Sequence, residues 1–200
     1  IMNGGRISAE GAAARSWNNG MQLSGTLSFG DAVNTGTLTT GGAVALASNV
    51  QLNLDSAVLM NGVVSGAFGM HFGEMFLCDR VAVVVDAAGT LRLANSEEIG
   101  SLAGAGLVNL QGNTLTVGSS ASTTFSGILS GTGGSLWKSG QSVLTLTGSN
   151  TLSGGVRLSA GALQVGDNQA LGGGTLSLNG GRLSSDSTTS RQIANALLMD

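Results

Sequence analysis

Several residue types are scarce or missing in these 200 residues, and these absences limit the possible folds and cross-links. Proline is absent, which suits stacked strands because proline cannot donate to a strand ladder. The single cysteine, Cys78, excludes an internal disulfide but leaves the compartment open. Charged residues make up 10% of the chain, well below the roughly 25% of an average soluble domain. No apolar run approaches the ~20 residues that a membrane-spanning helix needs.

The charge that is present argues against nucleic acid as a partner. The formal net charge is −3, and no basic patch occurs along the chain. No N-terminal signal peptide is visible, and the chain opens at Ile1 without an initiator methionine. We therefore expect a mature or excised piece of a longer chain, and an apolar C-terminal end without a polar cap.

Glycine is abundant, with 34 residues, and it separates very short apolar–polar–apolar units. Side chains alternate between the two faces of a strand, so each unit predicts a short strand with two inward residues and one outward residue. Many short strands with turn glycines predict a coil around a narrow apolar core. The clearest units are Leu144-Thr145-Leu146, Val156-Arg157-Leu158, Leu163-Gln164-Val165 and Leu176-Ser177-Leu178.

The pattern also repeats over a long interval. Gly25-Thr26-Leu27 matches Gly89-Thr90-Leu91, and Val44-Ala45-Leu46 matches Val108-Asn109-Leu110 at the same offset. Self-similarity at a fixed interval is typical of repeat proteins. We therefore predict one all-β solenoid segment over residues 1–200, with several coils in each copy. The copies are expected at about 21–66, 88–131 and 143–200.

The stretch from Val143 to Leu183, VLTLTGSNTLSGGVRLSAGALQVGDNQALGGGTLSLNGGRL, resembles the autotransporter-associated β-strand repeat of bacterial surface proteins. The resemblance extends over roughly 21–66 and 88–200. It implies a right-handed parallel β-helix, the passenger of a type V secretion system. It implies little about activity, because adhesins, toxins and proteases all carry the repeat. The translocator barrel that usually follows such passengers is not in this sequence.

The segment 67–85 departs from the repeat. Phe68, Phe72 and Phe76 are spaced by four, which is compatible with a small helical excursion near 67–80. The alternative is an ordinary coil with unusual residues, since Gly69 and Gly73 weaken a helix. We favour the ordinary coil.

The same segment holds the strongest candidates for a metal site, His71, Glu74 and Cys78. These types can bind zinc, but their spacing is not a familiar paired pattern and no second pair supports it. A lone histidine among Phe and Met is more often a packed residue. We therefore expect no metal and no cofactor.

Catalytic patterns are equally weak. A Ser-His-Asp triad would need His71, and no G-x-S-x-G elbow occurs. Glu97 and Glu98 are adjacent, so they would point apart, and we expect them in a solvated turn. Trp17 and Trp137 offer surfaces for sugars but are more often cap or core residues. We expect no enzyme.

Three function classes remain open. The first is a non-catalytic passenger stalk at the bacterial cell surface, outer membrane-associated or extracellular, which mediates adhesion or holds an activity encoded elsewhere. The second is a self-assembling solenoid of an extracellular fibre or sheath, and the third is a carbohydrate-active enzyme. Weakly charged outward positions favour the first two. The expected partners are host or neighbouring-cell surface components or glycans, and further coils or copies of the chain at its C-terminal end.

Overall fold

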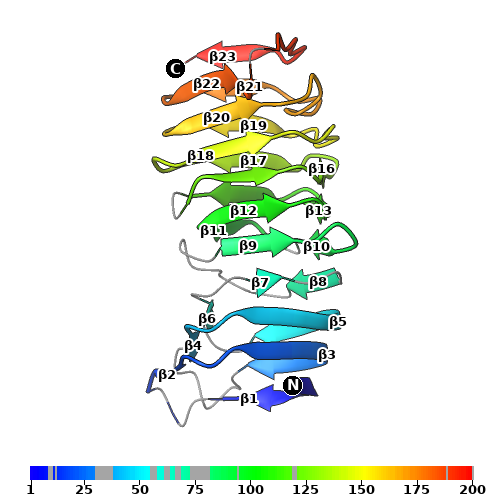
Figure 1. Cartoon of the computed structure of the whole chain (residues 1–200), viewed down its shortest axis with the longest axis vertical. Helices are drawn as coiled ribbons and strands as arrows, with labels where there is room; N and C mark the ends of the chain where they lie inside the picture. The colour runs from blue at the N-terminus through cyan, green and yellow to red at the C-terminus, as the bar shows by residue number, and fades with distance from the viewer. Residues whose placement is uncertain are drawn as a thin grey trace.

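The chain folds into a β-solenoid, seen in a computed structural model (Figure 1). All regular elements in the described residues are strands, and they stack into a column with the two termini at opposite ends. Every strand pair is parallel, as the resemblance to the autotransporter-associated repeat implies. The described residues are 1–8, 11, 13–29, 38–54, 58–60, 64–65, 69–72, 82–93, 95–118, 121–187 and 189–199.

The later coils have three sides, and each side is a parallel ladder that runs along the column. The first and second sides belong to one 14-stranded sheet, and the third side is a six-stranded sheet, counted over the described residues. The first side comprises β7 (Val64–Ser65), β9 (Ala82–Val85), β12 (Ser101–Gly104), β15 (Thr123–Phe125), β18 (Val143–Leu146), β20 (Ala162–Val165) and β22 (Arg182–Ser185). The second side comprises β8 (Gly69–Phe72), β10 (Thr90–Arg92), β13 (Leu107–Asn109) and β16 (Ile128–Ser130). The third side comprises β11 (Glu97–Ile99), β14 (Thr114–Val117), β17 (Ser135–Lys138), β19 (Gly155–Leu158), β21 (Leu176–Leu178) and β23 (Leu197–Met199).

In the first coils a single long strand covers both the first and the second side. The long strands are β1 (Met2–Ile7), β3 (Met21–Phe29) and β5 (Val44–Leu54). Val44 of β5 pairs with β7 and Val50 pairs with β8, so the two ladders diverge from this strand. A separate three-stranded ladder contains β2 (Arg15–Trp17), β4 (Leu38–Thr40) and β6 (Val58–Met60).

The long interval in the sequence corresponds to three steps along a ladder. Leu27 lies in β3 and its match Leu91 lies in β10, and β3 pairs with β5, β5 with β8 and β8 with β10. The matched units therefore share the second-side ladder, although Leu91 pairs through Met70 and Val50 with Gly25 rather than with Leu27. Val44 and Val108 do not share a row, because Val108 pairs through Leu91 and Met70 with Val50. The boundaries of the three copies stay a prediction.

The inward rows of side chains form one apolar core, as predicted. Seven of the eight predicted inward residues are buried: Leu144, Leu146, Val156, Leu158, Leu163, Val165 and Leu176. The eighth, Leu178, is half-buried and packs against the core. The predicted outward residues Thr145, Arg157, Gln164 and Ser177 are exposed or half-buried.

The helical excursion considered near 67–80 is wrong for the residues that the structure describes there. Residues 69–72 form β8, which pairs in parallel with β5 on one side and β10 on the other. The backbone N–H and C=O groups of β8 therefore form hydrogen bonds with neighbouring strands, where a helix would have paired them within itself. The ordinary coil is therefore the better description of this part, while 73–81 lies outside the described residues.

Stacked glycines make the corner between the first and second sides. Gly106, Gly127 and Gly148 lie one above the other in successive coils. A Cβ on Gly127 would overlap the carbonyl oxygen of Gly106, and a Cβ on Gly148 would overlap that of Gly127. Each corner therefore has room for backbone only, which explains why glycine recurs between the short strands.

In the coil that follows β16, the second side has no strand in the described residues, and Asn150 lies there instead. Its side chain is buried, accepts a hydrogen bond from the Leu129 amide at 2.7 Å and donates to the Ala170 carbonyl at 2.6 Å. One amide side chain thus bridges the coil below and the coil above. Buried polar groups are tolerated when they are paired in this way.

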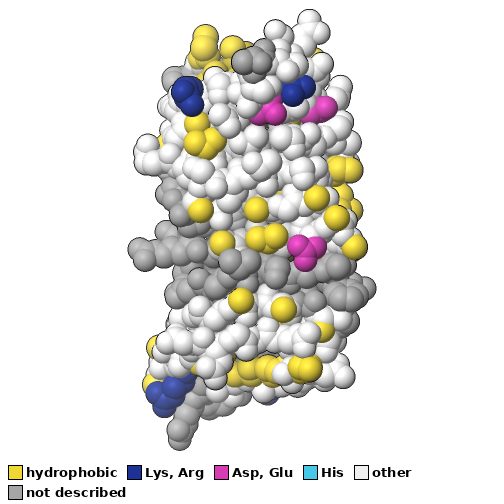
Figure 2. All heavy atoms as spheres, in the orientation of Figure 1, with side chains coloured by type: hydrophobic (Ala, Val, Ile, Leu, Met, Phe, Trp, Pro, Cys, Tyr) yellow, Lys and Arg dark blue, Asp and Glu magenta, His cyan; other side chains and the backbone are white. Residues whose placement is uncertain are grey.

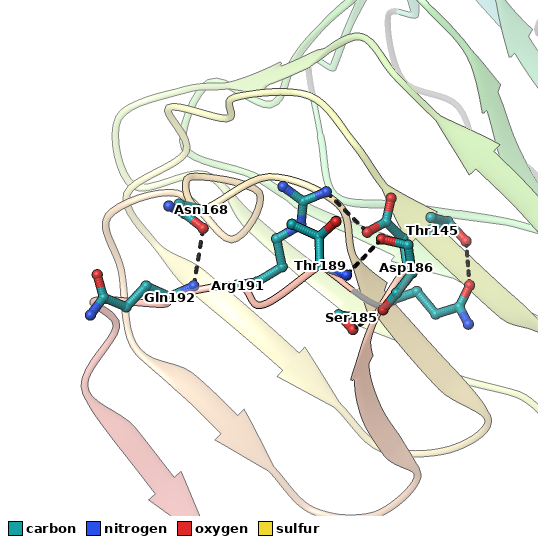
Figure 3. A network of polar contacts seen from close by, with 9 residues as sticks. Thr145, Asn168, Ser185, Asp186, Thr189, Arg191 and Gln192 are labelled. Carbon is teal, nitrogen blue, oxygen red and sulfur yellow. Dashed lines mark hydrogen bonds and ion pairs between the residues drawn. The ribbon is translucent and has the colours of Figure 1, made fainter.

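The segment after β22 contains a local ion pair and is tied to an earlier coil by a hydrogen bond (Figure 3). Arg191 pairs with Asp186 at 3.2 Å, and the Gln192 amide donates to Asn168 Oδ1 at 3.0 Å. Thr145 donates to Gln164 at 2.9 Å on the neighbouring first side. The segment therefore follows the solenoid path between β22 and β23.

We expect Leu146→Asp to unfold several coils and Thr145→Asp to leave stability nearly unchanged. Leu146 is fully buried. Removing a buried Leu side chain costs ~2–5 kcal/mol, and burying an unpaired carboxylate adds to that. Thermal unfolding followed by circular dichroism measures both variants. Equal losses of stability would contradict the register of β18.

We expect Gly127→Ala to lower the free energy of unfolding by ~1–3 kcal/mol, because the new methyl group overlaps the backbone of the coil below. Gly173→Ala is the matched control, since no heavy atom lies within 4 Å of a Cβ there. The control should be neutral or stabilise by up to about 1 kcal/mol. Urea unfolding compares the two, and similar midpoints would show that the corner can relax.

Candidate functional site

The sequence-based metal candidates are not brought together by anything that the structure describes. His71 lies in β8, where its backbone pairs with Gln51 and Arg92. Glu74 and Cys78 lie outside the described residues. Within the described part of the chain, no group of three His, Cys, Asp or Glu residues is placed to hold a metal ion. The expectation that these three residues hold no metal therefore stays a prediction.

Glu97 and Glu98 point to opposite faces, as expected, but the expected solvated turn is wrong. Both lie in strand β11 on the third side. Glu97 is buried at 4% exposure in the inward row, beside Leu115 of the next coil. Glu98 is exposed in the outward row. The two carboxylates cannot act together on one substrate, because the sheet separates them.

The outward row on the third side carries the most distinctive surface group. Paired residues place Trp137 above Thr116 and below Arg157, with Ser177 next. The guanidinium carbon of Arg157 lies 4.5 Å from the centroid of the Trp137 ring. The indole nitrogen of Trp137 donates to Ser159 Oγ at 2.7 Å. Trp137 is thus on the outer face, and the expectation of a cap or core residue is wrong for it.

A second outward row lies beside this one, and a shallow hollow opens between them. The second row contains Thr114, Ser135 and Gly155, which are paired across β14, β17 and β19. Gly155 leaves the hollow open because it has no side chain, and its φ of +100° and the nearby Thr175 carbonyl exclude one. We call this hollow the third-side groove. It has a volume of about 450 Å³, and its lining includes Thr114, Ser135, Trp137, Gly155, Arg157 and Thr175.

The groove has the chemistry of a binding site. Its lining offers one cation, one aromatic ring and several hydroxyl groups, and it contains no Asp, Glu, His or Cys. A nucleophile with an adjacent base, or a pair of carboxylates, is what covalent or acid–base catalysis would need. The described lining supplies neither of these arrangements, while its cation, aromatic ring and hydroxyl groups can hold a ligand.

Lys138, which sequence reasoning overlooked, is a buried cation inside the solenoid. It lies in the inward row between Val117 and Leu158 and is fully buried. Its Nζ donates to the carbonyl oxygens of Gly118 at 3.3 Å and Gly140 at 2.9 Å, and also to that of Ser139. Desolvation by burial lowers the pKa of the Lys138 amine. The side chain joins two coils at the corner between the third and first sides.

The outer surface carries few charges. Figure 2 shows a face with a few charged side chains and with apolar side chains that lie singly or in small groups. In the part of the chain that the structure describes, no helix is long and apolar enough to cross a membrane.

Two comparisons with known proteins found similarity, and one of them, the family match, lies on coils that carry the groove. Residues 136–165, from β17 to β20, match the family described as the passenger-associated transport repeat. The chain is 39% identical over 101 residues to the adhesin BmaC autotransporter of Brucella suis biovar 1 (strain 1330). That alignment covers 46% of this chain and only 3% of the relative. No solved structure matches the chain. Together with the solenoid, these matches confirm the resemblance to autotransporter-associated repeats.

We expect the stability of the chain to depend on pH through Lys138. The pKa of this amine is lowered in the folded chain and returns to about 10.4 on unfolding. Between these values the unfolded chain binds more protons, so the free energy of unfolding contributed by Lys138 rises with pH. Lys138→Met should abolish this rise, as measured by urea unfolding from about pH 7 to about pH 10.

Leu158→Met, in the same inward row, is the control for this experiment. It keeps the lysine and changes the volume little, so it should keep the rise in stability with pH. A parallel pH dependence in Lys138→Met and the unsubstituted chain would show that the buried amine does not titrate in this range.

Proposed function

We propose that this chain is a non-catalytic segment of the β-helical passenger of a bacterial autotransporter, carried at the cell surface, and that its outer faces mediate adhesion. The observation that carries the proposal is the match of residues 136–165 to a passenger-associated repeat, in a chain that folds as a parallel solenoid. The similarity to a relative named as an adhesin supports the adhesive role. Because the chain spans 3% of that relative, the activity of a whole passenger is part of the proposal.

A non-catalytic role is supported by the groove chemistry. The described lining of the third-side groove contains no acid and no nucleophile–base pair, and no group of three His, Cys, Asp or Glu residues elsewhere in the described chain could hold a metal ion. The partners that we propose are components or glycans of host or neighbouring cells. Localisation at the outer membrane or in the extracellular space belongs to the same proposal.

A fibre-forming role remains the second candidate because of the last coil. Leu197 and Met199 continue the inward rows of Leu176 and Leu178, yet they are 55% and 73% exposed. Among the described strands, β23 pairs only with β21. Such an edge favours pairing with another strand. We propose that further coils, from the same polypeptide or from another copy, cover this surface.

We expect microspheres coated with the purified chain to bind cultured epithelial cells more than microspheres coated with its Leu146→Asp variant. The variant differs at a single side chain but should lose the outward rows when its coils unfold. Flow cytometry measures the bound microspheres. Equal binding of the two, or binding no higher than that of bare microspheres, would contradict adhesion by the folded surface.

Light scattering and an activity panel test the two alternatives. Concentration-dependent elongation that is lost in the double variant Leu197→Asp, Met199→Asp would select the fibre. Hydrolysis of a polysaccharide or ester that is lost in His71→Ala or in a single Asp→Asn variant would overturn the non-catalytic role.

A further inference from the structure

Arg157 is held in one orientation on the outer face of the third side. Its Nε donates to Asn179 Oδ1 at 3.1 Å, and its planar group stacks on Trp137 at 4.5 Å. Asn179 also accepts from Ser177 at 2.9 Å, so the acceptor is itself positioned. A guanidinium fixed in this way loses little conformational entropy when it binds a ligand.

The two terminal nitrogens of Arg157 make no hydrogen bond with the described residues, while the side chain lines the third-side groove. They form a planar pair of donors that matches the two oxygens of a carboxylate. The ligand group that this geometry fits best is therefore a carboxylate, bound through two parallel hydrogen bonds.

The local charge is complementary to an anion although the whole chain is acidic. Among the described residues of the groove lining, Arg157 is the only charged one. The nearest acid in the same outward row is Glu98, three paired strands away through Thr116 and Trp137. At about 4.8 Å per strand this is roughly 14 Å, beyond the ~8 Å Debye length at physiological salt. Glu98 therefore does not neutralise Arg157.

The rest of the groove suits a sugar. The hydroxyl groups of Thr114, Ser135 and Thr175 line it and make no hydrogen bond with the described residues. Thr114 and Ser135 are directly paired, so the hydroxyls follow the column axis at a spacing of about 4.8 Å. The half-buried indole of Trp137 adds an apolar surface beside them. A volume of about 450 Å³ holds a small ligand or one short stretch of a polymer.

We propose that the third-side groove binds a carboxylate-bearing saccharide, such as a uronic acid unit of an acidic polysaccharide. Arg157 binds the carboxylate, and Thr114, Ser135 and Thr175 bind sugar hydroxyls. This inference rests on the proposed function in one respect, since the groove must face the outside of the cell to meet such a polymer. The proposal places the adhesive surface on the third side of the solenoid.

The test uses the intrinsic fluorescence of Trp137. The chain has two tryptophans, so a Trp17→Phe background leaves Trp137 as the sole reporter in the groove. Titration with trigalacturonate should give a saturable change. Arg157→Gln should weaken binding roughly tenfold or more, because hydrogen bonds to a charged group are lost. Arg157→Lys should weaken binding as well, because lysine keeps the positive charge but lacks the planar pair of N–H donors.

Two controls separate the carboxylate from other causes. Arg182→Gln removes one exposed positive charge from the first side and should leave the affinity unchanged. Galactotriose, which has the hydroxyls without the carboxylates, should bind the unsubstituted chain as weakly as trigalacturonate binds Arg157→Gln. Circular dichroism should show that the Arg157 variants keep the fold, because this side chain is exposed.

Three results would overturn the inference. One is the absence of saturable binding by trigalacturonate, and another is an affinity that does not change in Arg157→Gln. The third is equal binding of acetyl-trialanine, whose terminal carboxylate lacks a sugar. Each can occur while coated microspheres still adhere to cells, so failure here is distinguishable from failure of the adhesive role.

Discussion

The vertical register between coils is the constraint on which the rest of this structure depends. Parallel ladders hold each strand about 4.8 Å above the one before it, so equivalent residues of successive coils must stack directly. Where a corner turns, the stacking leaves no space for a Cβ, as at Gly127 above Gly106. Where a strand runs, it builds continuous inward and outward rows. The core, the corners and the groove all follow from this one geometry.

The polar residues of the interior show how such a column tolerates exceptions. Asn150 binds the Leu129 amide and the Ala170 carbonyl, and Lys138 binds carbonyl oxygens at a corner. In both cases one buried side chain satisfies backbone groups of more than one coil. A buried polar group that is fully hydrogen-bonded specifies which coil lies next to which.

The sequence alone was sufficient for the short strands and their two faces because the strand period is local, whereas the parallel solenoid was implied by the resemblance. The alternation Leu144-Thr145-Leu146 defines an inside and an outside without knowledge of distant contacts, and burial agrees with it. The same alternation, continued from Leu136 through Trp137, would have placed Lys138 inside. Lysine is seldom buried, so its residue type outweighed its position in the pattern.

The candidate site was less accessible to sequence reasoning, for a physical reason. Trp137 and Arg157 are separated by one full coil of the chain, and they touch only because the length of that coil brings them into register. Adjacent residues such as Glu97 and Glu98 could be judged from the strand period, whereas stacking partners require the register. The segment with His71 contains residue types that can bind a metal, but the sequence spacing of these residues carried no information on the distances between coils.

The stacking of the corners also determines where residues can be inserted or deleted without disrupting the solenoid. An insertion of a single residue within β18 would turn every following side chain of that strand to the opposite face, and it would displace Gly148 from its position above Gly127. The turn 166–175 between β20 and β21 is different, because space is open around Gly173. Insertions and deletions are therefore expected in such turns, where they leave the number of residues per strand and corner unchanged.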